Sequence, residues 1–209
     1  ECQTNGKGRL KRSWHSPFGQ NIYLSLLYRF QQDVSEMAGL SLVISLAIIS
    51  ALESLKLPKS AYVKWPNDIV YEGKKLAGTL IEIQAEANGF CSAIIGIGLN
   101  VNMISANIDQ PWTSLRQISS EYIDRNLLCA TLLDNIFKYL QKFLTHGFKH
   151  FIPQWRGVDY LYDKTINLQT TNTKVTGRAN GIDEQGYLVL ELSNGQTCAF
   201  SYGDTMLLK

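Results

Sequence analysis

Several familiar kinds of catalytic and metal site are missing from this 209-residue sequence. Its four cysteines are scattered, with no Cys-x-x-Cys pair and no histidine at metal-ligand spacing, which is typical of a reduced, cytoplasmic protein. There is no Gly-x-Ser-x-Gly motif, no Ser-His-Asp grouping, no Walker loop and no Rossmann glycine fingerprint. The chemistry of this chain is therefore expected to rest on cations and positioning rather than on a covalent nucleophile.

Strong net charge and long apolar segments are also absent. The net charge of +2 gives no bulk electrostatic case for nucleic-acid binding. No signal peptide is visible, and serines, Glu53 and Lys56 interrupt the most apolar stretch, 40–57, which favours a core helix over a membrane span. With 45% hydrophobic and 18% charged residues, the chain can bury one sizeable core and carry a small second domain.

Hydrophobic spacing and turn residues predict a mixed fold. Strands are expected at 21–30, 62–65, 69–71, 76–85 and 91–99. Helices are expected at 35–57, capped by Ser35, and at 125–145 and 148–155. After Asp163 the pattern changes to short strands at 164–169, 173–180, 186–192 and 196–200, separated by tight turns. This second pattern predicts a small β-barrel.

The stretch 64–78 says most about function. Pro66 fixes its own φ at the end of a strand, so Asn67 and Asp68 are displayed rather than packed. Lys75 opens the return strand and is expected to face Asp68 across the hairpin. A cation held opposite a carboxylate suits a reaction that builds up negative charge.

A glycine-rich basic loop lies near the start of the chain. Gly6 and Gly8 allow close approach of the backbone to a ligand, and Lys7, Arg9 and Arg12 supply positive charge. Taken alone, such a loop is more often a solvated basic turn than an anion site.

Two weaker signals follow. At 96–102 a glycine-punctuated strand leads into a polar loop at two asparagines, a pattern that often marks only a bulge or close packing. Trp112, in the polar loop 102–113, can either stack on a nucleobase or fold back onto the core.

In this order, the motifs resemble those of biotin protein ligases. They occupy residues 6–14, 16–21, 64–68 (Lys-Trp-Pro-Asn-Asp), 75–80, 96–102 (Gly-Ile-Gly-Leu-Asn-Val-Asn) and 181–191. The resemblance implies an α/β (α+β) catalytic domain at 1–162, with a mixed sheet and helices like those of class II aminoacyl-tRNA synthetases. It further implies an SH3-like β-barrel at 163–209.

The resemblance also implies an ATP-dependent, AMP-forming ligase. Such an enzyme converts biotin and ATP to biotinyl-5′-AMP and transfers biotin to a lysine of the biotin carboxyl carrier protein of acetyl-CoA carboxylase. ATP and Mg²⁺ are the implied cofactors, and biotin and the carrier protein are the substrates. A homodimer is compatible with the resemblance, and DNA binding would need a winged-helix domain upstream of Glu1.

Residue roles follow from the same resemblance. The implied biotin-side residues are Gln3, Gly6, Lys7, Gly8, Arg9 and Lys75. The implied nucleotide-side residues are Arg12, Trp14, Asn67, Asp68, Asn100 and Trp112. Of these, Lys75, Arg9 and Asp68 are expected to be catalytic, and Asp68 is the expected magnesium ligand.

The sequence departs from the family pattern in its loop. Lys7 stands where arginine is usual and loses the planar fork, and Leu10-Lys11 replace the commoner Arg-Gly. The family segment that binds the biotin ureido ring lies upstream of this loop, so we expect further residues before Glu1.

Two alternatives stay open. A lipoate ligase or lipoyl transferase shares the superfamily, although the motif at 64–68 and the loop argue against it. A biotin-sensing DNA-binding repressor would need a helix-turn-helix that this sequence lacks.

Overall fold

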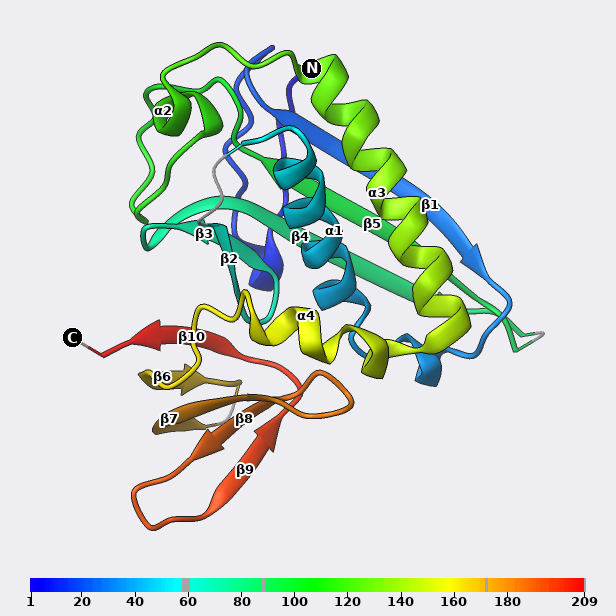
Figure 1. Cartoon of the computed structure of the whole chain (residues 1–209), viewed down its shortest axis with the longest axis vertical. Coiled ribbons are helices and arrows are strands. Elements are labelled where there is room, and N and C mark those ends of the chain that lie inside the picture. The colour runs from blue at the N-terminus through cyan, green and yellow to red at the C-terminus, as the bar shows by residue number, and fades with distance from the viewer. Residues whose placement is uncertain (58–60, 88, 172, 209) are drawn as a thin grey trace.

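A five-stranded antiparallel sheet organises most of the chain in this computed structural model, which describes residues 1–57, 61–87, 89–171 and 173–208 (Figure 1). Its strand order is β1-β5-β4-β3-β2. The strands are β1 (Ile22–Phe30), β2 (Ala61–Lys64), β3 (Asp68–Tyr71), β4 (Lys74–Ala85) and β5 (Cys91–Leu99), close to the predicted ranges.

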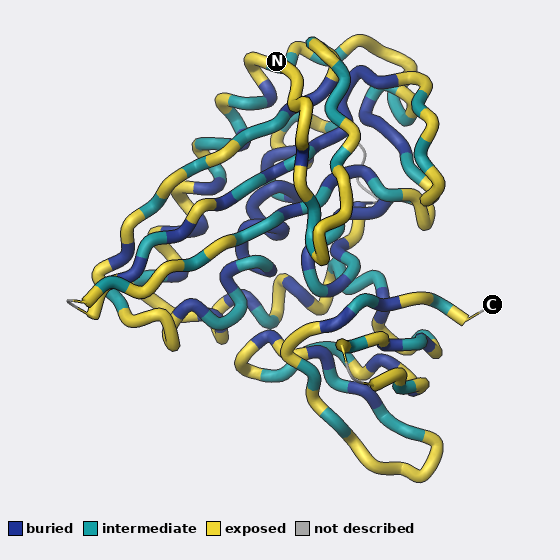
Figure 2. The backbone as a smooth tube through the Cα atoms, turned by 180° about the vertical axis from the view of Figure 1, so that it is seen from behind, coloured by how far each residue is buried: buried dark blue, intermediate teal, exposed yellow. Residues whose placement is uncertain are grey.

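The two faces of this sheet differ because side chains alternate along each strand. On β5, Ala93, Ile95 and Ile97 point to one face and are buried, and helices α1 (Leu40–Ser54) and α3 (Arg125–His146) cover that face (Figure 1). On the opposite face the same strand carries Gly96 and Gly98. The N-terminal segment crosses this second face (Figure 2). The sheet therefore has one packed face and one face with room for a ligand.

Helix α1 begins later than predicted, and the prediction that Ser35 caps it is wrong. Residues Val34–Met37 form a short 3₁₀ helix capped by Asp33, whose carboxylate accepts from the Ser35 N–H at 2.9 Å. Gly39, at φ +80°, then turns the chain into α1. A Cβ at Gly39 would lie 2.3 Å from the Phe148 ring, so a larger residue does not fit this junction.

The other helices are close to their predictions. Helix α3 is confirmed, with Asp124 as its N-cap. The helix predicted at 148–155 is split into a 3₁₀ turn, Phe148–Phe151, and α4 (Ile152–Arg156), whereas the short α2 (Leu115–Ser119) was not predicted. In the part of the chain that the structure describes, no helix combines the length and apolar character needed to cross a membrane.

A second five-stranded antiparallel sheet forms the C-terminal part, in the order β10-β6-β7-β8-β9. The strands are β6 (Thr165–Gln169), β7 (Lys174–Ile182), β8 (Leu188–Glu191), β9 (Thr197–Phe200) and β10 (Asp204–Leu207). The predicted class, an α/β layer followed by a small SH3-like β unit, is confirmed. However, strand pairing among the described residues does not close this sheet into a barrel, and β10 was not predicted.

The C-terminal sheet packs directly on the motif at 64–68. The Trp65 indole N–H donates to the Gly186 carbonyl at 3.0 Å, and the Thr205 hydroxyl donates to the Trp65 carbonyl at 3.2 Å. Trp65 is buried, so both bonds are shielded from water. The motif is thus tied to both sheets.

Candidate active site

A cleft of about 1230 Å³ lies on the open face of the large sheet. It is lined by the N-terminal loop, the 64–68 motif, parts of β4 and β5, the loop at 107–112 and the start of β10. Every site residue predicted from the sequence lines this cleft. Residues distant in sequence are therefore brought to one place.

The glycine-rich loop is a tight, self-paired turn. The Gly8 N–H donates to the Arg12 carbonyl at 2.7 Å, and the Trp14 N–H donates to the Gly6 carbonyl at 2.8 Å. A Cβ at Gly6 would lie 2.7 Å from the Trp14 carbonyl oxygen and 2.8 Å from the Gln3 Oε1, which accepts from the Ser16 hydroxyl. Glycine is therefore needed at position 6 for the loop to close.

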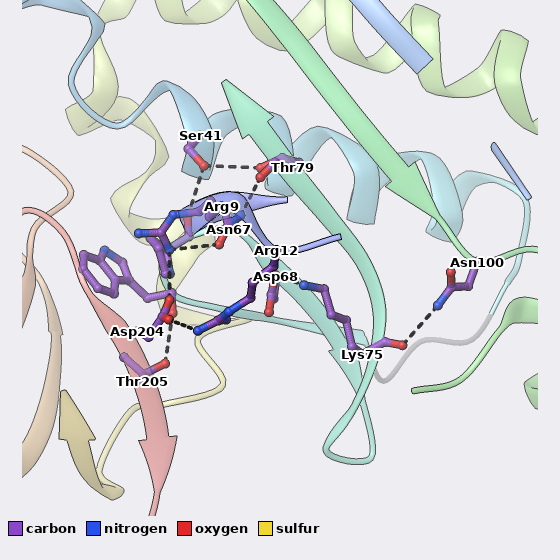
Figure 3. A network of polar contacts seen from close by, with 12 residues as sticks. Arg9, Arg12, Ser41, Asn67, Asp68, Lys75, Thr79, Asn100, Asp204 and Thr205 are labelled. Carbon is purple, nitrogen blue, oxygen red and sulfur yellow. Dashed lines mark hydrogen bonds and ion pairs between the residues drawn. The ribbon is translucent and has the colours of Figure 1, made fainter. Parts of the chain in front are cut away.

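Arg9 points from this loop toward Asn67 (Figure 3). Its Nη1 donates to the Asn67 Oδ1 at 3.3 Å, and the Asn67 amide in turn donates to the Thr79 carbonyl. Burial lowers the pKa of Arg9, opposed by the nearby carboxylates of Asp204 and Asp68. A partly desolvated guanidinium of this kind is a strong binder of a phosphate or carboxylate ligand.

Lys75 and Asp68 form the ion pair that the hairpin predicts. The Lys75 Nζ lies 2.7 Å from the Asp68 Oδ1, and both side chains are about three-quarters shielded from solvent. A register shift between Ile69 and Val70 lets the two side chains meet. A Cβ at Gly78 would lie 3.1 Å from the Lys75 Cε, so glycine there makes room for the lysine.

Lys64 is a further cation in the cleft, and the sequence analysis assigned it no role. Burial lowers its pKa, while the charge of Asp68 opposes that shift and the neighbouring Lys75 reinforces it. Lysine at the start of the 64–68 motif was the available signal. Together with Arg9 and Arg12, these lysines make the cleft attractive to anions.

Trp14 forms part of the floor of the cleft. Its ring lies so close to Gly98 that a Cβ there would be 2.3 Å from the indole Cε2. The Lys75 Nζ lies 5.3 Å from the centre of the same ring. The indole Nε1 is buried and has no hydrogen-bond partner within the described residues, so it can donate to a ligand.

Asn100 and Trp112 belong to the wall of the cleft beside Lys75. The buried Asn100 amide donates to the Thr113 carbonyl at 3.0 Å, so this group already anchors the loop. The Lys75 N–H donates to the Pro111 carbonyl, and the Thr113 N–H donates to the Lys75 carbonyl, both at 2.9 Å. Trp112 is thereby held next to the catalytic candidate Lys75.

Asp204 and Thr205, on β10, were missed by the sequence analysis. Asp204 forms an ion pair with Arg12 and lies 3.7 Å from Arg9 (Figure 3). The only local signal was an acidic residue after Gly203, which is common at turns. Among the described residues, no three His, Cys, Asp or Glu side chains gather into a group that could hold a metal ion.

The arrangement defines an anion-binding cleft whose cations are positioned by glycine turns, as expected for a site that handles phosphate and carboxylate groups. The model of the "Biotin/lipoate A/B protein ligase family" matches residues 1–100, and that of the "Biotin protein ligase C terminal domain" matches residues 163–207. The chain belongs to the biotin protein ligase family.

Individual relatives agree with this assignment. The chain is 30% identical to a Mycobacterium tuberculosis protein named "Biotin--[acetyl-CoA-carboxylase] ligase", covering 100% of the chain and 77% of that protein. It is 36% identical to the "Bifunctional ligase/repressor BirA" of Salmonella typhimurium, covering 91% of the chain but only 60% of that relative. The structure of an Aquifex aeolicus biotin protein ligase in complex with biotin and ATP matches all of the chain and 86% of that ligase, with a TM-score of 0.84 and 29% identity.

Proposed function

We propose that this chain activates biotin with ATP and transfers the biotinyl group to a lysine of a biotin carboxyl carrier protein. In the first step a biotin carboxylate oxygen attacks the α-phosphorus of ATP, and pyrophosphate leaves. In the second step the carrier's lysine amine attacks the carbonyl carbon of biotinyl-5′-AMP, and AMP leaves as an amide forms. The names of the Mycobacterium and Aquifex relatives support this reaction.

The Lys75–Asp68 pair is the observation that carries the proposal. Biotin carboxylate and ATP α-phosphate are both anionic, so bringing them together needs a cation at the point of attack. The Asp68 carboxylate holds the Lys75 ammonium at 2.7 Å, and the absence of a side chain at Gly78 leaves room for the lysine. A charge positioned before the reaction requires little reorganisation when negative charge develops.

The loop supplies the second set of contacts. Arg12 would bind phosphate oxygens of ATP. Arg9, Lys7 and the backbone around Gly6 and Gly8 would lie on the biotin side, against biotin and the adenylate phosphate. We place Gln3 on the biotin side as well. Since its Oε1 already accepts from Ser16, its role would be to fix the loop entry or to exchange that partner for the ligand.

The nucleotide side is proposed to lie at Trp14, Asn67, Asn100 and Trp112. The unpartnered Trp14 N–H offers a donor, and the Trp112 ring offers a stacking surface for adenine. The side-chain amides of Asn67 and Asn100 already donate to backbone carbonyls. Both residues would therefore hold the walls of the cleft in place rather than donate these N–H groups to ATP.

Magnesium fits this cleft only as a companion of ATP. Mg²⁺ usually keeps waters and takes one or two carboxylates plus substrate phosphates. Asp68 provides one such carboxylate, but its Oδ1 is engaged by Lys75, so the remaining oxygen would be the ligand. When bound, the ion would neutralise phosphate charge.

Residues 1–162 form the proposed catalytic domain, and residues 163–209 form a second domain, which borders the cleft through β10. A carrier protein is the partner that the transfer step requires. A homodimer and DNA binding stay predictions without a described contact to support them, and the chain spans 60% of the ligase/repressor relative.

The test is a transfer assay with the full chain, ATP, Mg²⁺ and either biotin or lipoate. Mass spectrometry of a carrier domain would report attachment, and pyrophosphate release would report activation. We expect release and attachment with biotin only. Transfer of lipoate without transfer of biotin would establish the alternative function instead.

A further inference from the structure

The two arginines of the glycine-rich loop reach across the cleft to the C-terminal sheet. Both terminal nitrogens of Arg9 lie 3.3 Å from the Gly203 carbonyl, and its Nη1 lies 3.7 Å from the Asp204 Oδ1. The Arg12 Nη2 forms an ion pair with the Asp204 Oδ2. The Asp204 carboxylate thus attracts two guanidinium groups, and both arginines lie more than 190 positions before it in the sequence.

The acceptors on the C-terminal side are held in place. Asp204 pairs with Gln169 in the sheet, and the Thr205 hydroxyl donates to the Trp65 carbonyl. Gly203 has φ +149°, and a Cβ there would lie 2.6 Å from the Leu168 side chain, so this turn packs closely on β6. Asp204 is therefore a fixed point for the loop.

The loop has little else to hold its tip. Its short 3₁₀ helix, Arg9–Lys11, contains no buried residue, and Leu10 is 67% exposed. Leu10 and Lys11 adopt φ +54° and +60°, a region that is unfavourable for residues other than glycine. With backbone strain and no apolar burial, the tip depends on polar contacts to stay closed.

We propose that Asp204 is a positioning residue for the reaction: it holds Arg9 and Arg12 over the cleft before substrate binds, and then releases Arg12 to an anionic substrate. Arg12 is the one to exchange because its side chain is 64% exposed, against 24% for Arg9. Arg9 also keeps Asn67 and Gly203 as partners. The proposal rests on the proposed function only for the identity of that anion, the ATP phosphates.

Trypsin provides a test on the ligand-free protein, because the loop contains four cleavage points, Lys7, Arg9, Lys11 and Arg12. Asp204→Asn removes the charge with little change in shape. We expect loop cleavage about tenfold faster in this variant, since cleavage follows the open population. Glu191→Gln, which breaks the exposed Arg178 pair on the same sheet, is the matched control and should cleave as the wild type does.

Kinetics separate positioning from a purely structural role. Asp204→Asn should raise the KM for ATP about tenfold with a smaller change in kcat, and Asp204→Glu should restore most of the loss.

If Asp204→Asn fails to fold by circular dichroism, Arg12→Gln breaks the same pair from the loop side and should accelerate cleavage at the remaining sites. Equal cleavage rates in the wild type and the folded variant overturn the proposal. Because this proteolysis uses neither biotin nor ATP, its outcome is independent of whether wild-type protein transfers biotin.

Discussion

The ammonium nitrogen of Lys75 lies 2.7 Å from the Asp68 carboxylate, although the two residues are not register partners in the β3–β4 hairpin. Asp68 pairs with Gly78 and Lys75 with Val70, and the irregularity between Ile69 and Val70 lets the lysine lean back toward the carboxylate. The glycine opposite Asp68 leaves space for it. The pair is thus a product of the bulge and the glycine together.

Removal of this cation should slow activation. We expect Lys75→Ala to lower the rate of biotin-dependent pyrophosphate release by about 10²–10³, the usual cost of one preorganised charge contact. Lys74→Ala, an exposed neighbour on the same strand, is the control and should stay near the wild-type rate. Near-normal release from a folded Lys75→Ala protein would exclude the catalytic assignment.

Gly98→Ala should displace Trp14 without unfolding the protein. A Cβ at position 98 would lie 2.3 Å from the indole ring, which can swing away at the cleft surface. We expect a changed intrinsic fluorescence spectrum and a KM for ATP raised about tenfold, since a misplaced binding group costs roughly 1–2 kcal/mol. Gly157→Ala, whose Cβ would meet only an ordinary 3.5 Å contact, should leave both unchanged.

Trp65→Phe should lower the free energy of unfolding by about 1–3 kcal/mol. The variant leaves the Gly186 carbonyl without its donor in a buried position and removes part of a packed ring. Urea unfolding measures the change, and Tyr62→Phe, at a 41%-exposed residue of β2 shortly before Trp65, is the control. An equal, small effect of both substitutions would show that the contact between the two sheets adds little stability.

Alkaline pH should weaken the fold in part through Tyr23. Burial raises the pKa of Tyr23 to about 12, and its hydroxyl donates to the Pro17 carbonyl at 2.9 Å. The unfolded tyrosine ionises near pH 10, so the folded state binds more protons between about pH 10 and pH 12, and stability falls as pH rises through that window. After allowance for solvent screening we expect about 1 kcal/mol.

The measurement is urea unfolding across that pH window. Tyr23→Phe should be less stable near neutral pH because the bond to Pro17 is lost, yet it should show a shallower alkaline decline than wild type. Tyr187→Phe, at an exposed tyrosine, should follow the wild-type curve. Parallel alkaline slopes for Tyr23→Phe and wild type would contradict the assignment.

Local signals predicted the elements that rely on neighbours in sequence. Runs of aromatic and aliphatic residues and the turn residues beside them located β1, β4 and β5, and the apolar spacing of α3 located that helix. The boundary of α1 was misplaced because Gly39 turns the chain at φ +80°, and the Phe148 ring, distant in sequence, leaves no room for a side chain at that position.

The sequence by itself indicated that Lys75 faces Asp68, because the rigid Pro66 turn and the hairpin specify that local geometry, whereas the other residues of the cleft were expected there only from the resemblance to biotin protein ligases. The tertiary structure alone decided that Asp204 and Thr205 join them and that Trp65 serves the contact between sheets. Those contacts connect segments about 120 to 190 positions apart. Which residues meet in these contacts depends on how the two sheets pack, and local sequence propensities carry no information about that packing.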